Sequence, residues 1–286
     1  MSVRLISALS FVVFAPLIGG LISGIDRRIT ARMQGRFGPP VLQPFYDVYK
    51  LLQKENVIAR VRQNAYIDFY LLFVIFSGML LFAGQDLLLF IFSLTLASVF
   101  FILAAFKGSS PYSLVGAQRE LLLVMGYEPM VLFAAVAFYM ATGSFWVSKI
   151  IVHPVLLIKL LPGIFLGFFY ILTIKLRKSP YDLSTSHHGH QELVKGLTTE
   201  FAGPSLAMIE VAHWYETVFL LAFVYLFFAA TPWLGALAVV VCYFLEILID
   251  NVFARAKWEV AVKSSWLVAA VLGFGNVAVL YLLKGF

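Results

Sequence analysis

Thiol groups and charged side chains are scarce in this 286-residue sequence. The single cysteine, Cys242, lies in an apolar run. The chain by itself therefore forms no disulfide, and it lacks the four thiolates that iron–sulfur clusters usually require. Charged residues make up 13% of the sequence, whereas soluble domains have about a quarter. This scarcity excludes a separate water-soluble domain and indicates that most of the chain lies in lipid.

Long apolar runs account for most of the sequence, with 62% hydrophobic residues and a mean hydropathy of +0.92. A transmembrane helix needs about 20 mostly apolar residues. The runs are too uniformly apolar for the alternation of barrel strands. We therefore predict an all-α, polytopic membrane protein with one membrane domain over residues 1–286. Eight spans are expected, near residues 5–24, 66–83, 87–106, 121–142, 154–174, 208–230, 233–252 and 265–283.

Lys and Arg are distributed unequally between the loops of this topology. Of the 21 basic residues, 17 fall on one side, which the positive-inside rule makes cytoplasmic. Both termini are then predicted to lie outside, and two long loops, 25–65 and 175–207, to lie in the cytoplasm. We interpret the net charge of +6 as this orientation signal rather than as a nucleic-acid surface. Most positive charges follow the first run, which favours a retained helix over a signal peptide.

The first long loop has two parts. Residues 38–40 are Gly-Pro-Pro, which forbids a regular helix. Farther on, Phe45, Val48, Tyr49 and Leu52 recur at helical spacing among polar residues, which predicts a short amphipathic helix. Such a helix either lies at the lipid interface or offers a docking surface to a protein.

The second long loop carries three histidines within four residues, His187, His188 and His190, followed by Glu192. Imidazole is a common metal ligand. However, Gly189 interrupts the cluster and the sequence has no HExxH spacing. We therefore expect a docking surface that binds backbone, carboxylates or protons, and no metal site.

Acidic residues inside the predicted spans are the strongest functional signal. Glu128 lies in the fourth span, where an exposed carboxylate would cost about 2.5 to 3.5 kcal/mol, so it must face the bundle interior or water. It either belongs to an ion path or hydrogen-bonds a neighbouring helix. Glu120, at the start of the same span, either joins that path or extends to the cytoplasmic surface.

The sixth span contains a titratable stripe. Its uninterrupted apolar run, 218–230, is too short to cross a membrane, so the helix must begin near residue 208. Glu210, His213 and Glu216 then lie at i, i+3 and i+6 and share one broad face, as a proton path or ion site requires. Glu210 could also be the polar end of the helix. Glu246 and Asp250 share a face near the cytoplasmic end of the seventh span, where reaching the surface is cheap, and their role is open.

Three segments in order along the chain resemble a known family, the eight-helix membrane subunit that joins the two arms of respiratory complex I. They are RMQGRFGPPVLQPFYDVYKLLQKE (32–55), QRELLLVMGYE (118–128) and HQELVKGLTTEFAG (190–203). Two features differ from complex I. The loop after GRFGPP is shorter, and the HHGH segment stands where complex I usually has acidic residues. Both are similar to the corresponding subunit of energy-converting, membrane-bound [NiFe] hydrogenases of the Ech, CO-linked and formate-hydrogenlyase types.

This resemblance implies a non-catalytic anchoring and coupling subunit in the cytoplasmic membrane of a prokaryote. It implies a NiFe centre and iron–sulfur clusters on partner subunits and no cofactor or metal in this chain. The implied partners are the large NiFe subunit, the small iron–sulfur subunit, a ferredoxin-like iron–sulfur subunit and an antiporter-like membrane subunit. Such a complex couples electron transfer from a donor such as ferredoxin to proton or sodium translocation.

The resemblance also implies roles for individual residues. The expected ion path consists of Glu128, Glu192, Glu200, Glu210 and Glu216, with Glu120, His213, Glu246 and Asp250 as further candidates. The expected docking residues for the soluble arm are Arg36, Gln43, Asp47 and Lys50, with His187, His188 and His190. Two alternatives remain open: the quinone-site subunit of complex I itself, and a self-contained ion transporter, although we find no repeated halves of the kind such transporters show.

Overall fold

The computed structural model describes residues 2–55, 61–178, 180–181, 184 and 195–284. Helices are the only extended regular elements in these ranges, and β pairing is limited to two isolated bridges. The α-helices are α1 (Ser2–Met33), α2 (Gln43–Leu52), α3 (Val61–Phe82), α4 (Leu87–Phe106), α5 (Pro111–Thr142), α6 (Val147–Ile151), α7 (Pro162–Lys175), α8 (Gly203–Leu226), α9 (Pro232–Val252), α10 (Trp258–Val268) and α11 (Gly275–Lys284). Short 3₁₀ turns precede α7 (Leu157–Lys159) and α8 (Gly196–Thr198), and a π-helical turn (Ala269–Phe274) joins α10 to α11.

Seven helices in the described ranges are long and apolar enough to cross a membrane. They correspond to seven of the eight predicted spans, which confirms the polytopic membrane fold. α1 and α5, with 32 residues each, extend well beyond their predicted bounds. The last span is one continuous rod of α10, the π turn and α11.

The predicted span at 154–174 is wrong, because this segment is not one continuous helix. The chain there makes a 3₁₀ turn, and then α7 begins at Pro162 and has 14 residues. Proline lacks a backbone N–H donor and suits only the first turn of a helix, so Pro162 starts a new helix instead of continuing one. A 14-residue helix is about 21 Å long, whereas the hydrocarbon core is about 30 Å thick. α7 therefore covers only part of the bilayer and ends at Lys175.

The predicted tight connection between the second and third spans is present as residues 83–86. Asp86 caps α4, since its Oδ1 accepts the backbone N–H groups of Leu88 (2.8 Å) and Leu89 (3.3 Å). The connection between α8 and α9 is longer than predicted, because α8 ends at Leu226 and α9 begins at Pro232.

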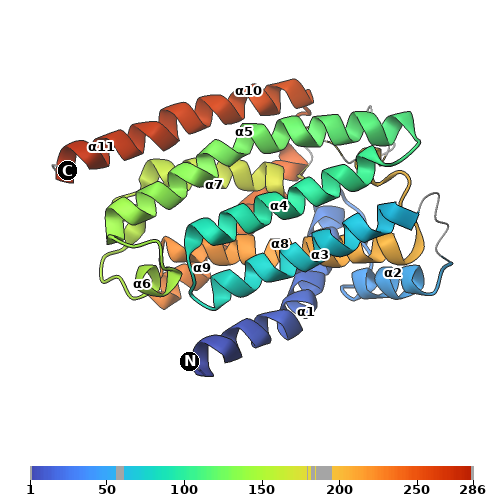
Figure 1. The fold of residues 1–286 in the computed structure, drawn as a ribbon, viewed down its shortest axis with the longest axis horizontal. Helices are drawn as coiled ribbons and strands as arrows, with labels where there is room; N and C mark the ends of the chain where they lie inside the picture. The colour runs from blue at the N-terminus through green and yellow to red at the C-terminus, as the bar shows by residue number, and fades with distance from the viewer. Residues whose placement is uncertain (1, 56–60, 179, 182–183, 185–194, 285–286) are drawn as a thin grey trace.

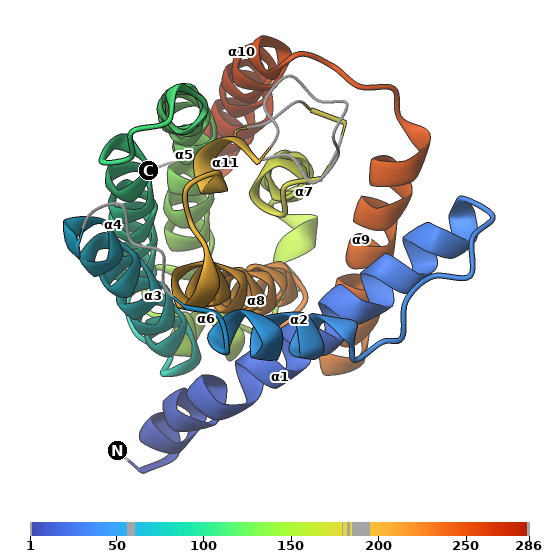
Figure 2. The same ribbon diagram turned by 90° about the vertical axis from the view of Figure 1, so that its right-hand side faces the viewer.

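Several of the long helices, among them α4 and α5, run roughly parallel to the long axis of the molecule, whereas α1 crosses it obliquely (Figures 1 and 2). α8 packs against α1, α2, α3 and α9, whereas α7 packs against α5 and α10. Stacked and tilted aromatic rings join these layers, with Phe168 and Phe223 4.4 Å apart and Phe138 and Phe227 4.8 Å apart between centroids. Such pairs stabilise by about 0.5–1.5 kcal/mol beyond their burial.

Glycines on α1 allow the first loop and α8 to approach its backbone. A Cβ on Gly24 would lie 1.8 Å from the carbonyl oxygen of Val41, and one on Gly19 would lie 2.5 Å from that of Trp214. The chain before α2 therefore folds back onto α1, and α2 is held against both α1 and α8.

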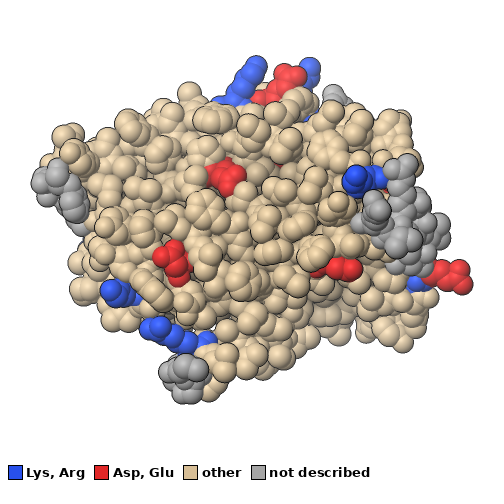
Figure 3. Space-filling view, in the orientation of Figure 1, with Lys and Arg blue, Asp and Glu red and all other residues tan. Residues whose placement is uncertain are grey.

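Charged side chains are sparse on the face shown in Figure 3, where Lys and Arg lie at the margins. α1, α9 and α10 expose many large apolar side chains, as expected for surfaces that contact lipid or neighbouring subunits. The start of α1 and the end of α11 both lie toward the left of Figure 1, and α2 lies at the right-hand end. That the α2 end faces the cytoplasm stays a prediction.

Candidate functional site

A central cavity of about 380 Å³ lies between α1, α8, α9 and the chain that follows α7. The three titratable residues predicted to share one face of a helix, Glu210, His213 and Glu216, all line it. The remaining polar and charged lining residues are Ser23, Asp26, Arg27, Thr30, Lys175, Arg177, Lys178, Thr217, Tyr243 and Asp250. The lining thus combines charged and polar groups with an apolar wall to which Leu176 and Trp214 contribute.

A second, much smaller cavity adjoins the first at Glu216. Its volume of about 20 Å³ is enough for one water molecule. The Tyr70 hydroxyl donates a hydrogen bond of 3.2 Å to Glu216, and Glu120 lines the same cavity. Glu120 accepts a hydrogen bond from Ser184 and lies 3.6 Å from the Arg177 guanidinium. Glu120 therefore does not extend to the surface but joins Glu216 in the interior.

A third cavity, also of about 20 Å³, continues from the second toward Glu128. Ser98, Tyr127 and Lys175 line both small cavities. Glu128 is half-buried and accepts a hydrogen bond from Thr95 of α4. The three cavities thus share lining residues in sequence through the bundle, with Glu210 on the central one and Glu128 on the third, whose wall is mainly apolar.

The end of α7 supplies three cations to this region. Arg177 has a φ of 54°, and the backbone N–H groups of Arg177 and Lys178 bond to Ile174 O and Thr173 O, both at 3.0 Å. This is a Schellman helix end, with arginine where glycine is usual. A left-handed conformation costs an L-residue about 1–2 kcal/mol. After the turn Arg177 faces Glu120 and Lys178 faces Asp26, whereas Lys175, at the end of the helix, lies over the Tyr127 ring.

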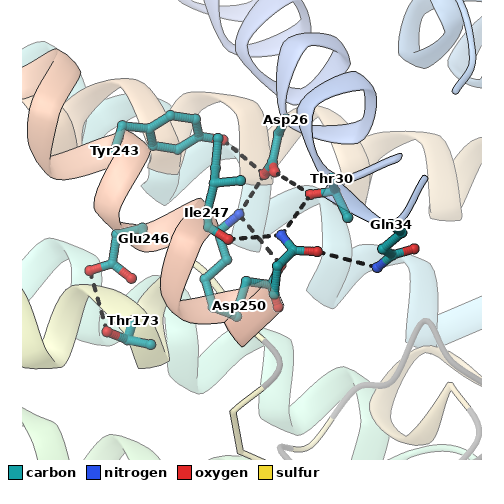
Figure 4. A network of polar contacts seen from close by, with 10 residues as sticks. Asp26, Thr30, Gln34, Thr173, Tyr243, Glu246, Ile247 and Asp250 are labelled. Atoms are coloured by element: carbon teal, nitrogen blue, oxygen red, sulfur yellow. Dashed lines mark hydrogen bonds and ion pairs between the residues drawn. The ribbon is translucent and has the colours of Figure 1, made fainter. Parts of the chain in front are cut away.

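A buried ion-pair network connects α1, α9 and the end of α7 (Figure 4). Lys178 Nζ lies 2.5 Å from Asp26 Oδ2 and 3.9 Å from Asp250 Oδ2. The Tyr243 hydroxyl donates to Asp26 at 3.1 Å, and Thr30 donates to the other Asp26 oxygen at 3.4 Å. Lys178 is only 5% exposed. One ammonium thus serves two carboxylates from helices far apart in the sequence.

The burial of Glu246 contradicts the expectation that this side chain could reach the surface. Its side chain is fully buried between α7 and α9, at 0% exposure. Thr173 donates a hydrogen bond of 3.3 Å to Oε1, and Oε2 has no hydrogen-bond partner among the described residues. Figure 4 shows Glu246 turned toward Thr173 and away from Asp26. Glu246 lies outside the three cavities, whereas Asp250, one turn farther along α9, lines the central one.

Glu200 is placed at the α4–α5 turn rather than at the cavities. Its carboxylate accepts hydrogen bonds from the backbone N–H of Ser109, at 2.7 Å, and from that of Ser110, so it caps the start of α5. Glu192, His187, His188 and His190 lie outside the described residues. Among the residues that are described, no group of three or more His, Cys, Asp and Glu side chains is arranged to hold a metal ion.

Three of the predicted docking residues, Gln43, Asp47 and Lys50, lie on α2, and Arg36 lies in the loop before it. Arg27 of α1 donates to Asp47 at 2.7 Å and so attaches α2 to α1, whereas Gln43 donates to Asp47 at 3.0 Å within α2. Arg36 and Lys50 are exposed. Fewer apolar side chains of α2 face the interior than predicted. Phe45 does so and packs on Trp214, with ring centroids 5.1 Å apart. Tyr49 and Leu52, in contrast, are 63% and 55% exposed.

We expect Asp47→Asn to weaken the attachment of α2 in a pH-dependent way. Burial raises the pKa of Asp47, but the hydrogen bonds from Arg27 and Gln43 outweigh it and hold the pKa below its usual range. A carboxyl group whose pKa is lower in the folded state stabilises the fold at pH values above its unfolded pKa of about 4. That stabilisation is lost as the pH falls through the folded pKa. The Arg27 and Asp47 side chains are each about two-fifths exposed, so their ion pair contributes at most about 1 kcal/mol to stability.

The measurement is thermal unfolding of the two purified proteins between pH 3 and pH 7. Wild type should be more stable than Asp47→Asn near pH 7, and the difference should shrink as the pH falls below about 4 toward the lowered folded pKa of Asp47. A difference that does not change with pH would contradict this account.

The fold and the charged interior define a class of protein: a polytopic membrane protein with a buried series of acidic and basic side chains. The chain belongs to the family described as NADH dehydrogenase, whose sequence model matches residues 6–281.

Relatives within this family come from two kinds of membrane complex. Hydrogenase-4 component C of Escherichia coli is 30% identical, over 71% of this chain and 68% of its own length. Formate hydrogenlyase subunit 4 of the same organism is 28% identical, over 98% of this chain and 97% of its own length. A subunit of NADH-quinone oxidoreductase from Syntrophotalea carbinolica is 26% identical, over 89% and 88%. The family thus belongs to membrane oxidoreductase complexes with several subunits.

A solved structure shows the same fold. A chain of the membrane-bound sulfane sulfur reductase, an archaeal respiratory membrane complex, superposes with a TM-score of 0.83 at 23% identity. The match covers 96% of this chain and 99% of that one. The family match and the relatives confirm the resemblance to the complex I linking subunit that three sequence segments indicated, and this structure shows the same fold.

Three side chains of the site are missed by sequence reasoning: Lys175, Arg177 and Lys178. Charge counting treats them only as orientation signals. Asp26 is missed as well, because it follows the predicted end of the first span at residue 24. The sequence does indicate that the first helix continues past residue 24, because no helix breaker occurs between residue 24 and Gly35. In the structure α1 continues to Met33.

Proposed function

We propose that this chain is the non-catalytic anchoring and coupling subunit of an energy-converting, membrane-bound [NiFe] hydrogenase. In this role it links electron transfer in a soluble arm to ion translocation in the membrane. The observation that carries the proposal is the set of titratable side chains, Glu210, Glu216 and Glu128, that line three adjoining cavities of the bundle. Buried titratable groups in such a series are what proton movement through a low-dielectric bundle requires.

The redox groups are assigned to partner subunits. Cys242, the single cysteine, is buried in α9, and the site of this chain offers carboxylates, ammonium groups and hydroxyls rather than thiolates. These residues fit ion transfer and do not fit a NiFe centre or an iron–sulfur cluster. The partners we expect are the large NiFe subunit, the small iron–sulfur subunit, a ferredoxin-like subunit and an antiporter-like membrane subunit. The expected location is the cytoplasmic membrane of a prokaryote.

The relatives named for hydrogenase-4 and formate hydrogenlyase support the hydrogenase assignment. A second candidate, the quinone-site subunit of complex I, is favoured by the relative named for NADH-quinone oxidoreductase. The central cavity is large enough for part of a ring system, but Asp26, Lys178 and Asp250 would have to be desolvated against it. Burying charge beside an apolar ligand is costly, so the geometry favours the first candidate.

The exposed part of α2 is the proposed attachment point of the soluble arm. Lys50 offers charge there, and Tyr46, Tyr49 and Leu52 offer apolar area. Aromatic residues are enriched at protein interfaces. A half-apolar helix also suits the lipid interface, so purification of the intact complex is needed to separate the two partners.

Purification in mild detergent from the native membrane tests the proposed function. We expect nickel and iron in the complex, hydrogen evolution with reduced ferredoxin, and ion uptake when the complex is placed in liposomes. Quinone reduction without nickel would instead place the chain in complex I. Ion flux through the purified chain alone would show a self-contained transporter and would contradict the coupling role.

A further inference from the structure

A groove of about 510 Å³ lies between the start of α1 and the end of α3, apart from the three cavities of the site. Buried Ala8 and Leu80 form its floor, and the more exposed side chains of Leu5, Phe76 and Met79 form its rims. Its volume is within the range of about 300–1,000 Å³ that is usual for small-molecule sites. The apolar lining suits a hydrocarbon chain and not an ion.

The groove opens beside the contact that holds α1 and α3 together. Phe11 of α1 stacks on Phe82 of α3, with ring centroids 4.7 Å apart, and a Cβ on Gly78 would overlap the Phe11 ring. The groove residues of α3, from Phe76 to Ala83, lie on a neighbouring stripe of the same helix. Seven residues of helix give that stripe a length of about 10 Å. The close contact on one stripe therefore leaves an open channel along the next.

The groove also has a polar part, which Arg4 and Gln85 provide. Arg4 is the first residue of the membrane span in α1, and Gln85 follows the end of the α3 span at Phe82 by three residues. The start of α1 and the α3–α4 turn lie toward the same side in Figure 1. Both polar side chains are therefore at the border of the hydrocarbon core, where lipid headgroups lie.

The charge at this border is positive and available. Arg4 is exposed, and no carboxylate among the described residues pairs with its guanidinium. Asp86, next to Gln85 in the chain, directs its carboxylate to backbone N–H groups at the start of α4. A guanidinium suits a phosphate group because it can form two parallel hydrogen bonds with it.

We propose that this groove binds one anionic phospholipid, with its phosphate at Arg4 and Gln85 and an acyl chain over Ala8 and Leu80. The charge and the hydrocarbon of such a lipid match the two parts of the lining. A helix of a partner subunit, about 10–12 Å wide, would lie across the groove and leave its floor unfilled. An acyl chain can fill the floor. The site does not depend on which redox reaction the complex performs.

The experiment uses the whole complex in mild detergent and phospholipids that carry a photoreactive group in the acyl chain. Phosphatidylglycerol is the anionic probe, and phosphatidylcholine is the zwitterionic one. Mass spectrometry of the peptides locates the label. We expect phosphatidylglycerol to label the groove segments of α1 and α3 about fivefold more than phosphatidylcholine, the preference that one basic side chain gives.

Three substitutions separate the phosphate contact from the acyl contact. Arg4→Gln should lower labelling by phosphatidylglycerol to the level of phosphatidylcholine, whereas Arg4→Lys should keep most of the preference. Ala83→Phe should fill the groove and remove labelling by both lipids. Lys159→Gln is the matched control, because Lys159 is exposed in the 3₁₀ turn before α7 and does not line the groove.

Equal labelling of the wild-type groove by the two lipids would overturn the anionic site, as would a wild-type preference in Arg4→Gln. Undiminished labelling in Ala83→Phe would place the lipid outside the groove and would overturn it as well. Absence of lipid label from this groove in the wild-type complex would show that a partner subunit covers it. Should Arg4→Gln fail to assemble, Ala83→Phe carries the test, because it leaves the charge in place.

Discussion

Glu216→Gln is expected to leave the complex assembled while reducing the ions moved per electron by about 100-fold, the lower range for loss of an acid–base group. Glutamine has the same shape as glutamate and still offers an oxygen to the Tyr70 hydroxyl, which now lies 3.2 Å from the carboxylate. It cannot take up or release a proton. Because Glu216 borders both the central cavity and the second one, its loss interrupts the path at the junction.

The measurement is ion uptake by reconstituted liposomes with simultaneous electron transfer. Proton uptake is followed with a pH-sensitive dye, and sodium uptake with a radioactive tracer. Glu259→Gln is the matched control, because Glu259 is exposed in the first turn of α10. Ion uptake per electron at the wild-type value in Glu216→Gln would remove Glu216 from the path. An equal loss in Glu259→Gln would point to a general effect on assembly.

The acidic part of the site could be predicted because membrane thickness constrains the sequence. The apolar run after Glu216 is too short to cross a bilayer, so the helix had to extend back through Glu210. In the structure α8 begins at Gly203. The same reasoning predicted Glu128 inside the bundle, since a carboxylate exposed to lipid is costly, but the structure leaves it half-buried beside Thr95 of α4.

The basic part of the site could not be predicted from composition and spacing. Lys and Arg at the end of a span usually mark the cytoplasmic side, and nothing in the sequence separates such residues from Lys175, Arg177 and Lys178. Their burial depends on what packs around the end of α7. Hydropathy alone predicted a full span at 154–174, because the apolar residues around Pro162 outweigh the proline in any average. α7 begins later than predicted, at Pro162, but ends close to the predicted residue, and the cations after it are buried because α1 and α5 pack around them with Asp26 and Glu120.

Glu246 shows a related difficulty. Its distance from the end of α9 suggested contact with the surface, but burial is decided by the neighbouring helix. α7 lies against α9 at Thr173 and covers the carboxylate. A pattern along one helix predicts which residues share a face, whereas the depth of that face depends on the partner that packs against it.

The second large effect is expected at the ion-pair network. Lys178→Met should lower the free energy of unfolding by about 3–5 kcal/mol, the cost of removing one partner of a buried pair. Asp26 and Asp250 would then keep their charges without the ammonium that now lies 2.5 Å and 3.9 Å from them. Methionine preserves most of the packing volume of lysine, so lost contacts contribute little.

A double-mutant cycle with Asp26→Asn separates lost charge pairing from lost packing. If the unpaired carboxylate causes the destabilisation, Lys178→Met combined with Asp26→Asn should be more stable than Lys178→Met alone. Thermal or denaturant unfolding of the purified subunit in detergent measures all four proteins. Lys263→Met on α10, an exposed position, should change stability by no more than about 0.5 kcal/mol.

Additive effects of the two substitutions, within about 0.5 kcal/mol, would show that the pair is not coupled. Recovery in the double variant would instead assign the effect to Asp26 itself, an acid on α1 that Lys178, Tyr243 and Thr30 contact through hydrogen bonds or ion pairs. Lys178 belongs to the same turn that positions Lys175 and Arg177. Weakening its ion pairs should therefore loosen the end of α7 and reduce coupling, even though Lys178 borders neither of the small cavities that lead to Glu128.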